Sequence, residues 1–377
     1  MTLENSEQQL DELRRRIDAT DSQLVQLLQQ RQALAAQVGV VKRKLGQPLY
    51  VPEREAAMFQ QRRDEAHRLG ISPDLIEDVL RRVIRDSYRQ QQAADVHLSD
   101  KRVVVIGGVG AMGRLFTRLF QNAGATVEVI DKDDWQRAAA SCEQADAVLI
   151  AVPLTVTEEV ILQLPMLPPS CVLADLTSIK EQPLAAMLAK HSGPVVGLHP
   201  MFGPQQVTLA KQLVVACHGR DEAGYQWLLQ AIEYWGARIK FISAAAHDQA
   251  MSFVQVLRHL SSFVYGAHLA QEQVDVQQLV ELSSPIYHLE LMMVGRLFAQ
   301  DAHLYADIIA ANPHHFKMLR RYVTLYDELL EELEQGNKQG FIERFAEVRK
   351  YFGEFAQKFL VESQRLLNVA GDAKQLS

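Results

Sequence analysis

Apolar residues recur at steps of three and four through the first quarter of the chain, a spacing that places them on one face of an α-helix. The pattern predicts a helix over about residues 6–44, about 58 Å long at 1.5 Å per residue. Two shorter helices are predicted near 53–69 and 73–91. Three helices with so long a first member cannot enclose a core by themselves. The apolar stripe along residues 6–44 therefore predicts a homodimer.

The pattern changes after a polar stretch at 93–100, which we interpret as a linker. From 101 to about 243, β-branched runs alternate with helical patterns, which predicts a parallel, doubly wound sheet with ligands at the carboxyl ends of its strands. From 244 to 377 the pattern is helical alone, with clear stretches at 248–271 and 285–299. The expected strands are 103–106, 127–130, 147–152, 171–175, 194–198, 213–217 and 237–242.

The predicted fold class is multidomain α and α/β: an all-helical domain (1–92), a Rossmann-like dinucleotide-binding domain (101–243) and an all-helical domain (244–377). A length of 377 residues exceeds one ordinary core. The net charge of −7 argues against a nucleic-acid partner. No apolar run reaches the ~18 residues of a membrane span, and no export signal is evident. With three scattered cysteines that lack metal-ligand spacing, we expect a cytoplasmic protein without a metal or membrane partner.

Residues 101–113 run from an apolar strand into Gly108-x-Gly110-x-x-Gly113. Gly108 allows a tight turn, Gly110 lets a diphosphate approach the main chain, and Gly113 lets the following helix pack closely. The next strand ends at Asp131, where a carboxylate accepts hydrogen bonds from the adenosine ribose and repels the extra phosphate of NADP. NAD is therefore the expected cofactor. The alternative is a glycine-rich turn that binds no nucleotide.

His199 follows the expected strand 194–198, at the edge where a nicotinamide should lie, and the preceding strand brings residues 175–180 to the same edge. A histidine there can accept the proton of a hydroxyl whose carbon loses hydride, because its unperturbed pKa is near neutrality. For an isolated histidine, a hydrogen-bonded turn residue is the more common alternative.

Arg31 lies on the apolar line of the helix predicted over 6–44, where a charge without a partner is costly, so we expect it to face an anion. Lys42 follows almost three turns later and projects from the same face about 16 Å away. Two cations so placed can hold a compact dicarboxylate from either end. Arg14 falls about 100° round the helix from Arg31. It cannot easily serve the same pocket in the same chain.

The segment from His199 to Pro204, His-Pro-Met-Phe-Gly-Pro, with Ser178 before it, resembles the prephenate dehydrogenase family. The first 92 residues resemble the all-helical chorismate mutases. The order of the two halves is similar to that in the bifunctional chorismate mutase–prephenate dehydrogenases of tyrosine biosynthesis, and the likeness covers nearly the whole chain. Further segments that carry the resemblance are 244–249, 255–259 and 283–301.

In the dehydrogenase half, the resemblance implies NAD-dependent oxidative decarboxylation of prephenate to 4-hydroxyphenylpyruvate. His199 would accept a hydrogen bond from the ring hydroxyl, and Ser178 would help to hold both groups. Arg296 would pair with the ring carboxylate, because its planar fork matches two oxygens. His259 would lie near the substrate, with Gln255 one helical turn before it. Arogenate in place of prephenate remains an alternative substrate.

In the mutase half, the resemblance implies rearrangement of chorismate to prephenate, with Arg14 entering the active site of the partner protomer. Glu55 would bind the substrate hydroxyl. Lys42 and Gln91 would hydrogen-bond the ether oxygen as the carbon–oxygen bond breaks. No nucleophile is needed, because restraining the substrate and stabilising charge on that oxygen suffice. The remaining pocket residues that the resemblance implies are Arg31, Arg54 and Ser87.

Two other interpretations stay open. Residues 1–92 could be a dimerisation arm without catalysis attached to a dehydrogenase, although Arg31 on the apolar stripe argues against it. The glycine turn could belong to a nucleotide-sensing binding protein, although His199 and Arg296 argue for chemistry. The family's place in its pathway further implies feedback inhibition by tyrosine. The sequence departs from the mutase family at Val51 and Pro52, where an acid or amide is usual, so no role is assigned there.

Overall fold

The computed structural model describes residues 3–45, 47, 50–91, 98–206, 208–311 and 313–374. By their internal contacts the residues form two compact units, Met1–Ala244 and Ala245–Ser377. Among the described residues, no helix is both long and apolar enough to cross a membrane.

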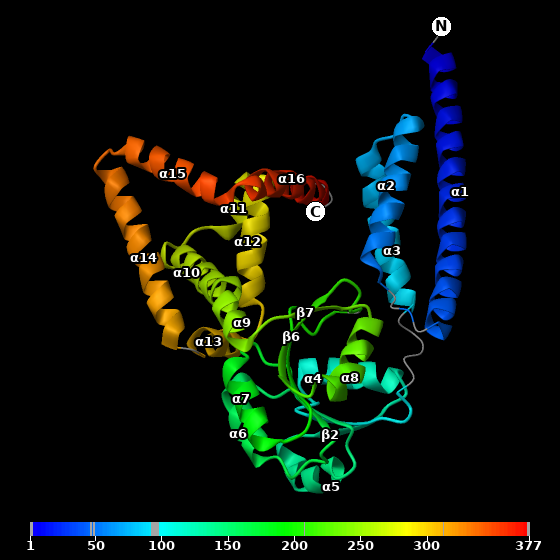
Figure 1. The fold of residues 1–377 in the computed structure, drawn as a ribbon. Helices are drawn as coiled ribbons and strands as arrows, with labels where there is room; N and C mark the ends of the chain where they lie inside the picture. Colours follow the sequence, from blue (N-terminus) through cyan, green and yellow to red (C-terminus); the bar gives the residue numbers. More distant parts are fainter. Residues whose placement is uncertain are drawn as a thin grey trace. The chain divides into compact units, whose positions relative to one another are not determined.

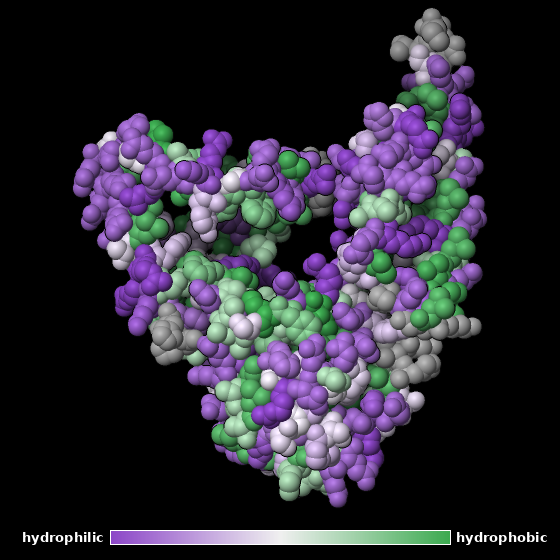
Figure 2. All heavy atoms as spheres, viewed as in Figure 1, coloured by the Kyte–Doolittle hydropathy of each residue, from purple (hydrophilic) through white to green (hydrophobic). Residues whose placement is uncertain are grey.

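The first unit begins with three helices that lie side by side (Figure 1): α1 (Leu3–Lys44), α2 (Pro52–Arg68) and α3 (Pro73–Gln91). Their bounds are close to the predicted ones. Proline opens α2 and α3, where its missing N–H has no intrahelical partner to lose. Apolar side chains stay exposed along α1, where Figure 2 shows green atoms among purple ones. These exposed residues include Leu10, Leu13, Ile17, Leu24, Leu27, Leu34, Val38 and Val41.

A seven-stranded sheet follows, in the order β2-β1-β3-β4-β5-β6-β7. All neighbouring strands are parallel except β5 and β6, which run antiparallel. Between β5 and β6, the described residues 201–206 and 208–212 form no helix that could carry the chain back across the sheet, so β6 runs in the opposite direction to β5. The bounds are β1 (Arg102–Ile106), β2 (Thr126–Ile130), β3 (Ala147–Ile150), β4 (Val172–Asp175), β5 (Val195–Pro200), β6 (Leu213–Arg220) and β7 (Arg238–Phe241).

Helices cover both faces of this sheet, because successive strand residues point to opposite sides. One apolar cluster joins the sheet to α4 (Ala111–Asn122) and α8 (Glu222–Tyr234). The other joins it to α5 (Ala138–Cys142), α6 (Thr157–Gln163) and α7 (Glu181–Lys190). Two short 3₁₀ helices, η1 (Lys132–Arg137) and η2 (Leu154–Val156), lie in the connections.

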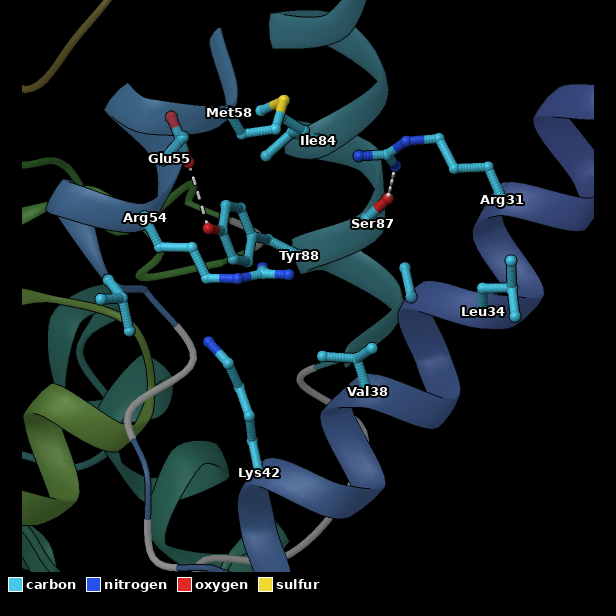
Figure 3. Close-up of a pocket in the computed structure, with 12 residues that line it drawn as sticks. Arg31, Leu34, Val38, Lys42, Arg54, Glu55, Met58, Ile84, Ser87 and Tyr88 are labelled. Atoms are coloured by element: carbon cyan, nitrogen blue, oxygen red, sulfur yellow. Dashed lines mark hydrogen bonds between the residues drawn. The ribbon is translucent and has the colours of Figure 1, made fainter. Parts of the chain in front are cut away.

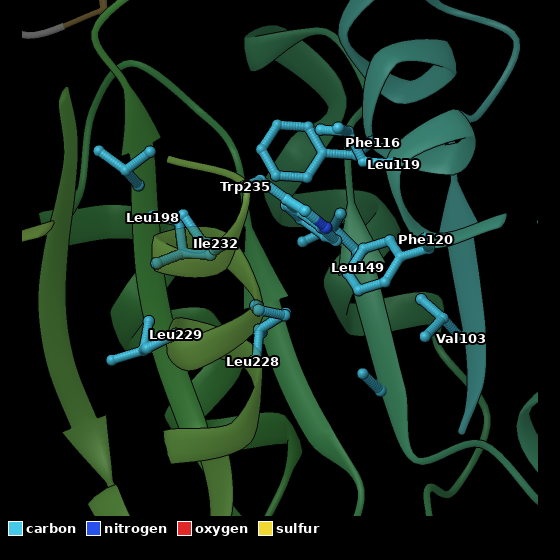
Figure 4. Close-up of a cluster of buried hydrophobic side chains, with 14 of the residues drawn as sticks. Val103, Phe116, Leu119, Phe120, Leu149, Leu198, Leu228, Leu229, Ile232 and Trp235 are labelled. Carbon is cyan, nitrogen blue, oxygen red and sulfur yellow. The ribbon is translucent and has the colours of Figure 1, made fainter. Parts of the chain in front are cut away.

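Aromatic packing fixes α4 against the sheet (Figure 4). The ring of Trp235 meets Phe116 and Phe120 edge to face, with ring centroids 6.4 and 5.0 Å apart. Phe116 and Phe120 lie one turn apart on α4 and are fully buried. This contact joins α4 to the end of α8 in the apolar cluster on one face of the sheet.

The second unit is helical throughout its described part, as predicted. Its first long segment differs from the expected continuous helix over 248–271, because a π-helical stretch, η3 (Ser252–Leu257), separates α9 (Ala244–Met251) from α10 (Arg258–Gln271). The other helices are α11 (Val276–Leu282), α12 (Pro285–Phe298), α13 (Ala302–Ala310), α14 (Pro313–Glu334), α15 (Lys338–Phe352) and α16 (Glu354–Lys374).

Candidate active sites

A cavity of about 260 Å³ lies among α1, α2 and α3 (Figure 3). Lys42 extends into it from α1 and Arg54 from α2. Arg31, also on α1, donates from Nη1 to Oγ of Ser87 on α3 at 2.9 Å. Five predicted mutase residues thus meet at one cavity. The described residues that line it are Arg31, Leu34, Ala35, Val38, Lys42, Val51, Arg54, Glu55, Met58, Ile84, Ser87 and Tyr88.

The charges of this cavity suit an anion. Three of the lining residues are cationic and one is acidic. Burial lowers the pKa of the Arg31 guanidinium, and burial followed by the nearby charge of Arg54 lowers the pKa of the Lys42 ammonium. A bound anion would stabilise these partly desolvated cations. Apolar lining residues supply the remaining walls, so the cavity fits a compact molecule with two carboxylates.

Glu55 is held at both carboxylate oxygens. Its Oε2 accepts a hydrogen bond from the hydroxyl of Tyr88 at 3.1 Å, and its Oε1 is ion-paired with Lys211, which lies between β5 and β6. Burial first, then the charge of Glu55, raises the pKa of Tyr88, so the phenol stays a donor. Sequence reasoning missed both partners. Tyr88 adjoins the predicted Ser87 and could have been noticed, whereas no local signal links Lys211 to this site.

Of the predicted mutase residues whose side chains the structure describes, Arg14 is not part of the cavity. Arg14 is exposed on α1 and pairs with Asp11 of the same helix, at 3.5 Å. Gln91 ends α3, but its side chain lies outside the described residues. A position of Arg14 outside the cavity of its own chain is what we expect if Arg14 enters the cavity of another protomer, as the resemblance implies.

The glycine turn has the shape that a pyrophosphate needs. A Cβ on Gly108 would lie 2.6 Å from Val129, and one on Gly113 would lie 2.3 Å from the carbonyl oxygen of Gly107. Neither position accepts a side chain. Gly110 precedes α4 without a side-chain cap, so the first N–H groups of that helix face outward for an anion. The backbone here fits a dinucleotide.

Asp131 lies directly after β2, beside this turn. The N–H of Gly107 donates to the carbonyl oxygen of Ile130 at 2.8 Å, which ties the glycine turn to the end of β2. The Asp131 carboxylate also accepts from the N–H of Lys132 at 3.0 Å, as the cap of η1. This capping contact fixes the acid at the place where the adenosine ribose of a dinucleotide would lie.

His199 is the penultimate residue of β5 and is only 3% exposed. Ser178 lies in the connection from β4 to α7, half-buried. Because β4 and β5 are parallel, with Asp175 opposite Gly197, both residues leave the sheet at the same edge. The structure thus brings the two predicted residues to the carboxyl edge of adjacent strands.

A buried ion pair contacts β5 next to His199, and sequence reasoning assigned it no role. Lys180 and Asp175 are both 0% exposed and form an ion pair. The Lys180 ammonium also donates to the carbonyl oxygen of Leu198 at 2.8 Å. A Cβ on Gly197 would lie 3.1 Å from the Lys180 side chain, so the lysine packs tightly against the backbone there. The pair fixes the backbone that carries His199.

The other predicted dehydrogenase residues belong to the second unit. Arg296 is exposed on α12, Gln255 lies in η3, and His259 lies near the start of α10. Burial, then the charge of Arg258, lowers the pKa of His259 to about 4, so its imidazole is neutral near pH 7. That ring packs edge-on against Tyr305, with centroids 4.7 Å apart.

Comparison with known proteins follows the same division of the chain. Residues 13–92 match the family "Chorismate mutase type II", residues 117–240 the "Prephenate dehydrogenase, nucleotide-binding domain" and residues 243–347 the "Prephenate dehydrogenase, dimerization domain". The T-protein of Enterobacter agglomerans is 52% identical over 97% of this chain and 99% of its own length. The chain belongs to the T-protein family. The T-protein of Haemophilus influenzae is 46% identical over 97% of this chain and 98% of its own length.

Membership of the T-protein family confirms the bifunctional interpretation. The chain is a chorismate mutase and a prephenate dehydrogenase of tyrosine biosynthesis, and its cofactor is NAD. Its fold is similar to that of a solved prephenate dehydrogenase from A. aeolicus in complex with hydroxyphenyl propionate and NAD+, with a TM-score of 0.55 at 17% identity, over 68% of this chain and 98% of that one. The dimerisation-arm and nucleotide-sensor alternatives are thereby excluded.

Asp131 gives a first prediction for this T-protein. We expect kcat/KM for prephenate oxidation to be at least about ten-fold higher with NAD than with NADP, because the carboxylate repels a phosphate on the ribose. Asp131→Ala should reduce this ratio, and Asp133→Ala, which removes an exposed acid two residues away, should not. Steady-state kinetics with both cofactors measure the ratio. Equal kcat/KM values in the unmodified protein would contradict the role of Asp131.

Proposed function

We propose that the cavity among α1, α2 and α3 is the site where chorismate is rearranged to prephenate. The observation that carries this proposal is the convergence of Arg31, Lys42 and Arg54 on a small, partly apolar cavity. Arg31 and Arg54 bind the two carboxylates and hold the compact conformer from which the rearrangement proceeds. Lys42 donates to the ether oxygen as its bond to carbon breaks, and Glu55 accepts from the substrate hydroxyl.

Two further residues complete the proposed mutase site. Ser87 holds the Arg31 guanidinium through the hydrogen bond described above. Gln91, one turn beyond Ser87 on α3, joins Lys42 at the ether oxygen. No covalent bond to the protein forms in this mechanism, so the site contributes restraint and electrostatic stabilisation alone.

For the dehydrogenase half, we propose that prephenate is oxidised beside His199. The glycine turn at Gly108, Gly110 and Gly113 would hold NAD, which would supply the hydride acceptor for the carbon that carries the ring hydroxyl. His199 accepts the hydroxyl proton, and Ser178 orients the hydroxyl and the imidazole. Loss of carbon dioxide from the ring then leaves a phenolate, to which His199 returns the proton to give the aromatic product. Arg296 binds the ring carboxylate before it leaves, with His259 and Gln255 near the substrate.

We propose further that the protein works as a homodimer. The exposed apolar stripe of α1 and the position of Arg14 outside the cavity of its own chain support this proposal. Packing two copies along α1 would bury the stripe and supply Arg14 to the partner's cavity. Residues 243–347 match a family described as a dimerization domain, and this match is a second argument that two chains associate.

Mixed dimers test this shared site. Arg14→Ala and Lys42→Ala chains are each expected to be poor mutases alone. In a heterodimer one of the two cavities contains neither substitution, so mixing the two proteins should restore mutase activity, up to about a quarter of that of the wild type at equal mixing. Tandem affinity tags isolate the heterodimer for assay. No recovery in a verified heterodimer would contradict the shared site.

The remaining proposals concern regulation and place of action. Tyrosine, which carries the phenol of the product, is proposed to inhibit by binding to the dehydrogenase half.

We place the protein in the cytoplasm. All three cysteines are free and buried, which is consistent with a reducing compartment. We place the domains at 1–92, 101–243 and 244–377, joined by a linker at 93–100. Prephenate, rather than arogenate, is the proposed substrate of the oxidation, because the mutase half supplies it.

A further inference from the structure

Lys211 contacts Glu55, a lining residue of the mutase cavity, from outside the three helices that form the cavity. Its ammonium is ion-paired with Oε1 of Glu55, although the two residues are far apart in the sequence. Its Nζ lies 5.6 Å from the centroid of the Tyr50 ring and 6.0 Å from that of Tyr88. These two rings meet edge to face at 6.2 Å. The ammonium therefore has a carboxylate and two aromatic faces as neighbours.

The backbone at Lys211 is anchored by the sheet domain. Its φ of +66° lies in the left-handed region, which a residue other than glycine seldom adopts. The Lys211 N–H donates to the carbonyl oxygen of Gly236 at 3.0 Å, and Leu209 is fully buried in the apolar core. A Cβ on Gly236 would lie 2.8 Å from Cα of Ala210, so the segment is packed tightly there. Such a conformation persists when its surroundings hold it in place.

The contact between Lys211 and Glu55 affects the net charge that a bound substrate meets in the cavity. Of the described residues that line the cavity, Glu55 alone is acidic. Chorismate carries two carboxylates, and an uncompensated Glu55 would repel them. The Lys211 ammonium offsets that repulsion from outside the lining, while the Tyr88 hydroxyl holds the second oxygen of Glu55 at 3.1 Å.

We propose that Lys211 is a positioning residue of the mutase site: it fixes the Glu55 carboxylate and offsets its repulsion of the dianionic substrate. The proposal rests on the assignment of this cavity as the mutase site. Lys211 lines no part of the cavity and acts through Glu55. The affinity of the mutase half for its substrate thus depends on a segment of the dehydrogenase half.

The experiment compares full-length variants by steady-state mutase kinetics. Lys211→Met should raise KM for chorismate by about three- to ten-fold, because a partly exposed ion pair contributes modestly. Its kcat should stay within about two-fold, because repulsion by Glu55 acts alike on bound substrate and transition state. Lys211→Arg should restore KM, and Lys240→Met, which removes an exposed lysine on β7, should leave KM at the wild-type value.

A double variant shows whether Lys211 acts through Glu55. In the Glu55→Gln background there is no negative charge to offset, so adding Lys211→Met should leave KM where Glu55→Gln alone placed it. An unchanged KM in Lys211→Met, with impaired kinetics in Glu55→Gln, would overturn the role of Lys211 and leave the cavity assignment standing. Wild-type kinetics in both Glu55→Gln and Lys42→Ala would overturn the cavity assignment itself.

Discussion

His199→Asn is expected to lower kcat of the dehydrogenase by at least ~100-fold while mutase turnover stays within about two-fold of the wild type. Asparagine preserves polarity and approximate size but cannot accept the hydroxyl proton as the ring carbon loses hydride. The mutase cavity contains no part of β5, so the first reaction has no reason to change. Oxidation of added prephenate and rearrangement of chorismate, assayed separately on the same preparation, measure the two rates.

The matched control is His218→Asn. His218 lies on β6, beside β5 in the same sheet, and pairs with Val196 rather than with the end of the strand that carries His199. It is exposed, and we expect the dehydrogenase rate of this variant to stay within about two-fold of the wild type. Dehydrogenase turnover in His199→Asn within ten-fold of the wild type would remove the imidazole from the proton transfer.

Lys42→Ala is expected to lower mutase kcat by about 100- to 1,000-fold, the usual cost of losing a donor aimed at developing negative charge. Lys42 extends into the cavity toward the Arg54 side chain (Figure 3). Its ammonium is partly desolvated, and this burial lowers its pKa. A cation in such a place stabilises a breaking ether bond more than a fully hydrated one would. Chorismate consumption at saturating substrate gives the rate directly.

Arg85→Ala serves as the control for charge. Arg85 lies on α3, which also carries Ser87, but it is exposed and lines no part of the cavity. Its removal takes away one positive charge and leaves the cavity intact, so kcat should stay within about two-fold. If Lys42→Ala retained a tenth or more of wild-type kcat, Lys42 would have no major part in the rearrangement.

The fold was largely predictable because it depends on local patterns. Periodic apolar residues located α1, α2 and α3, and alternating runs located all seven strands. Two features depended on more than periodicity. The antiparallel placement of β6 follows from a connection without a helix, and the π-helical η3 interrupts an otherwise regular helical pattern. Neither changes the apolar spacing enough to be seen in the sequence.

Candidate site residues were predictable where a helix face or the end of a strand determines their position. Arg31 and Lys42 share a face of α1, and His199 lies near the carboxyl end of β5, so their positions made them candidates before the resemblance was considered. The partners that hold them were not predictable in the same way. Lys180 buries its charge against Asp175 under β5, and such a contact depends on how distant segments meet. Resemblance supplied the roles of residues that spacing could not place.

One measurement tests most directly the claim that a single chain carries two separate sites. Lys42→Ala and His199→Asn proteins are each supplied with chorismate and NAD, alone and then mixed, and NADH is followed. Each protein alone should form almost no NADH, whereas the mixture should form it readily, since prephenate made by one protein is oxidised by the other. NADH formation in the mixture no faster than in either protein alone would contradict the account.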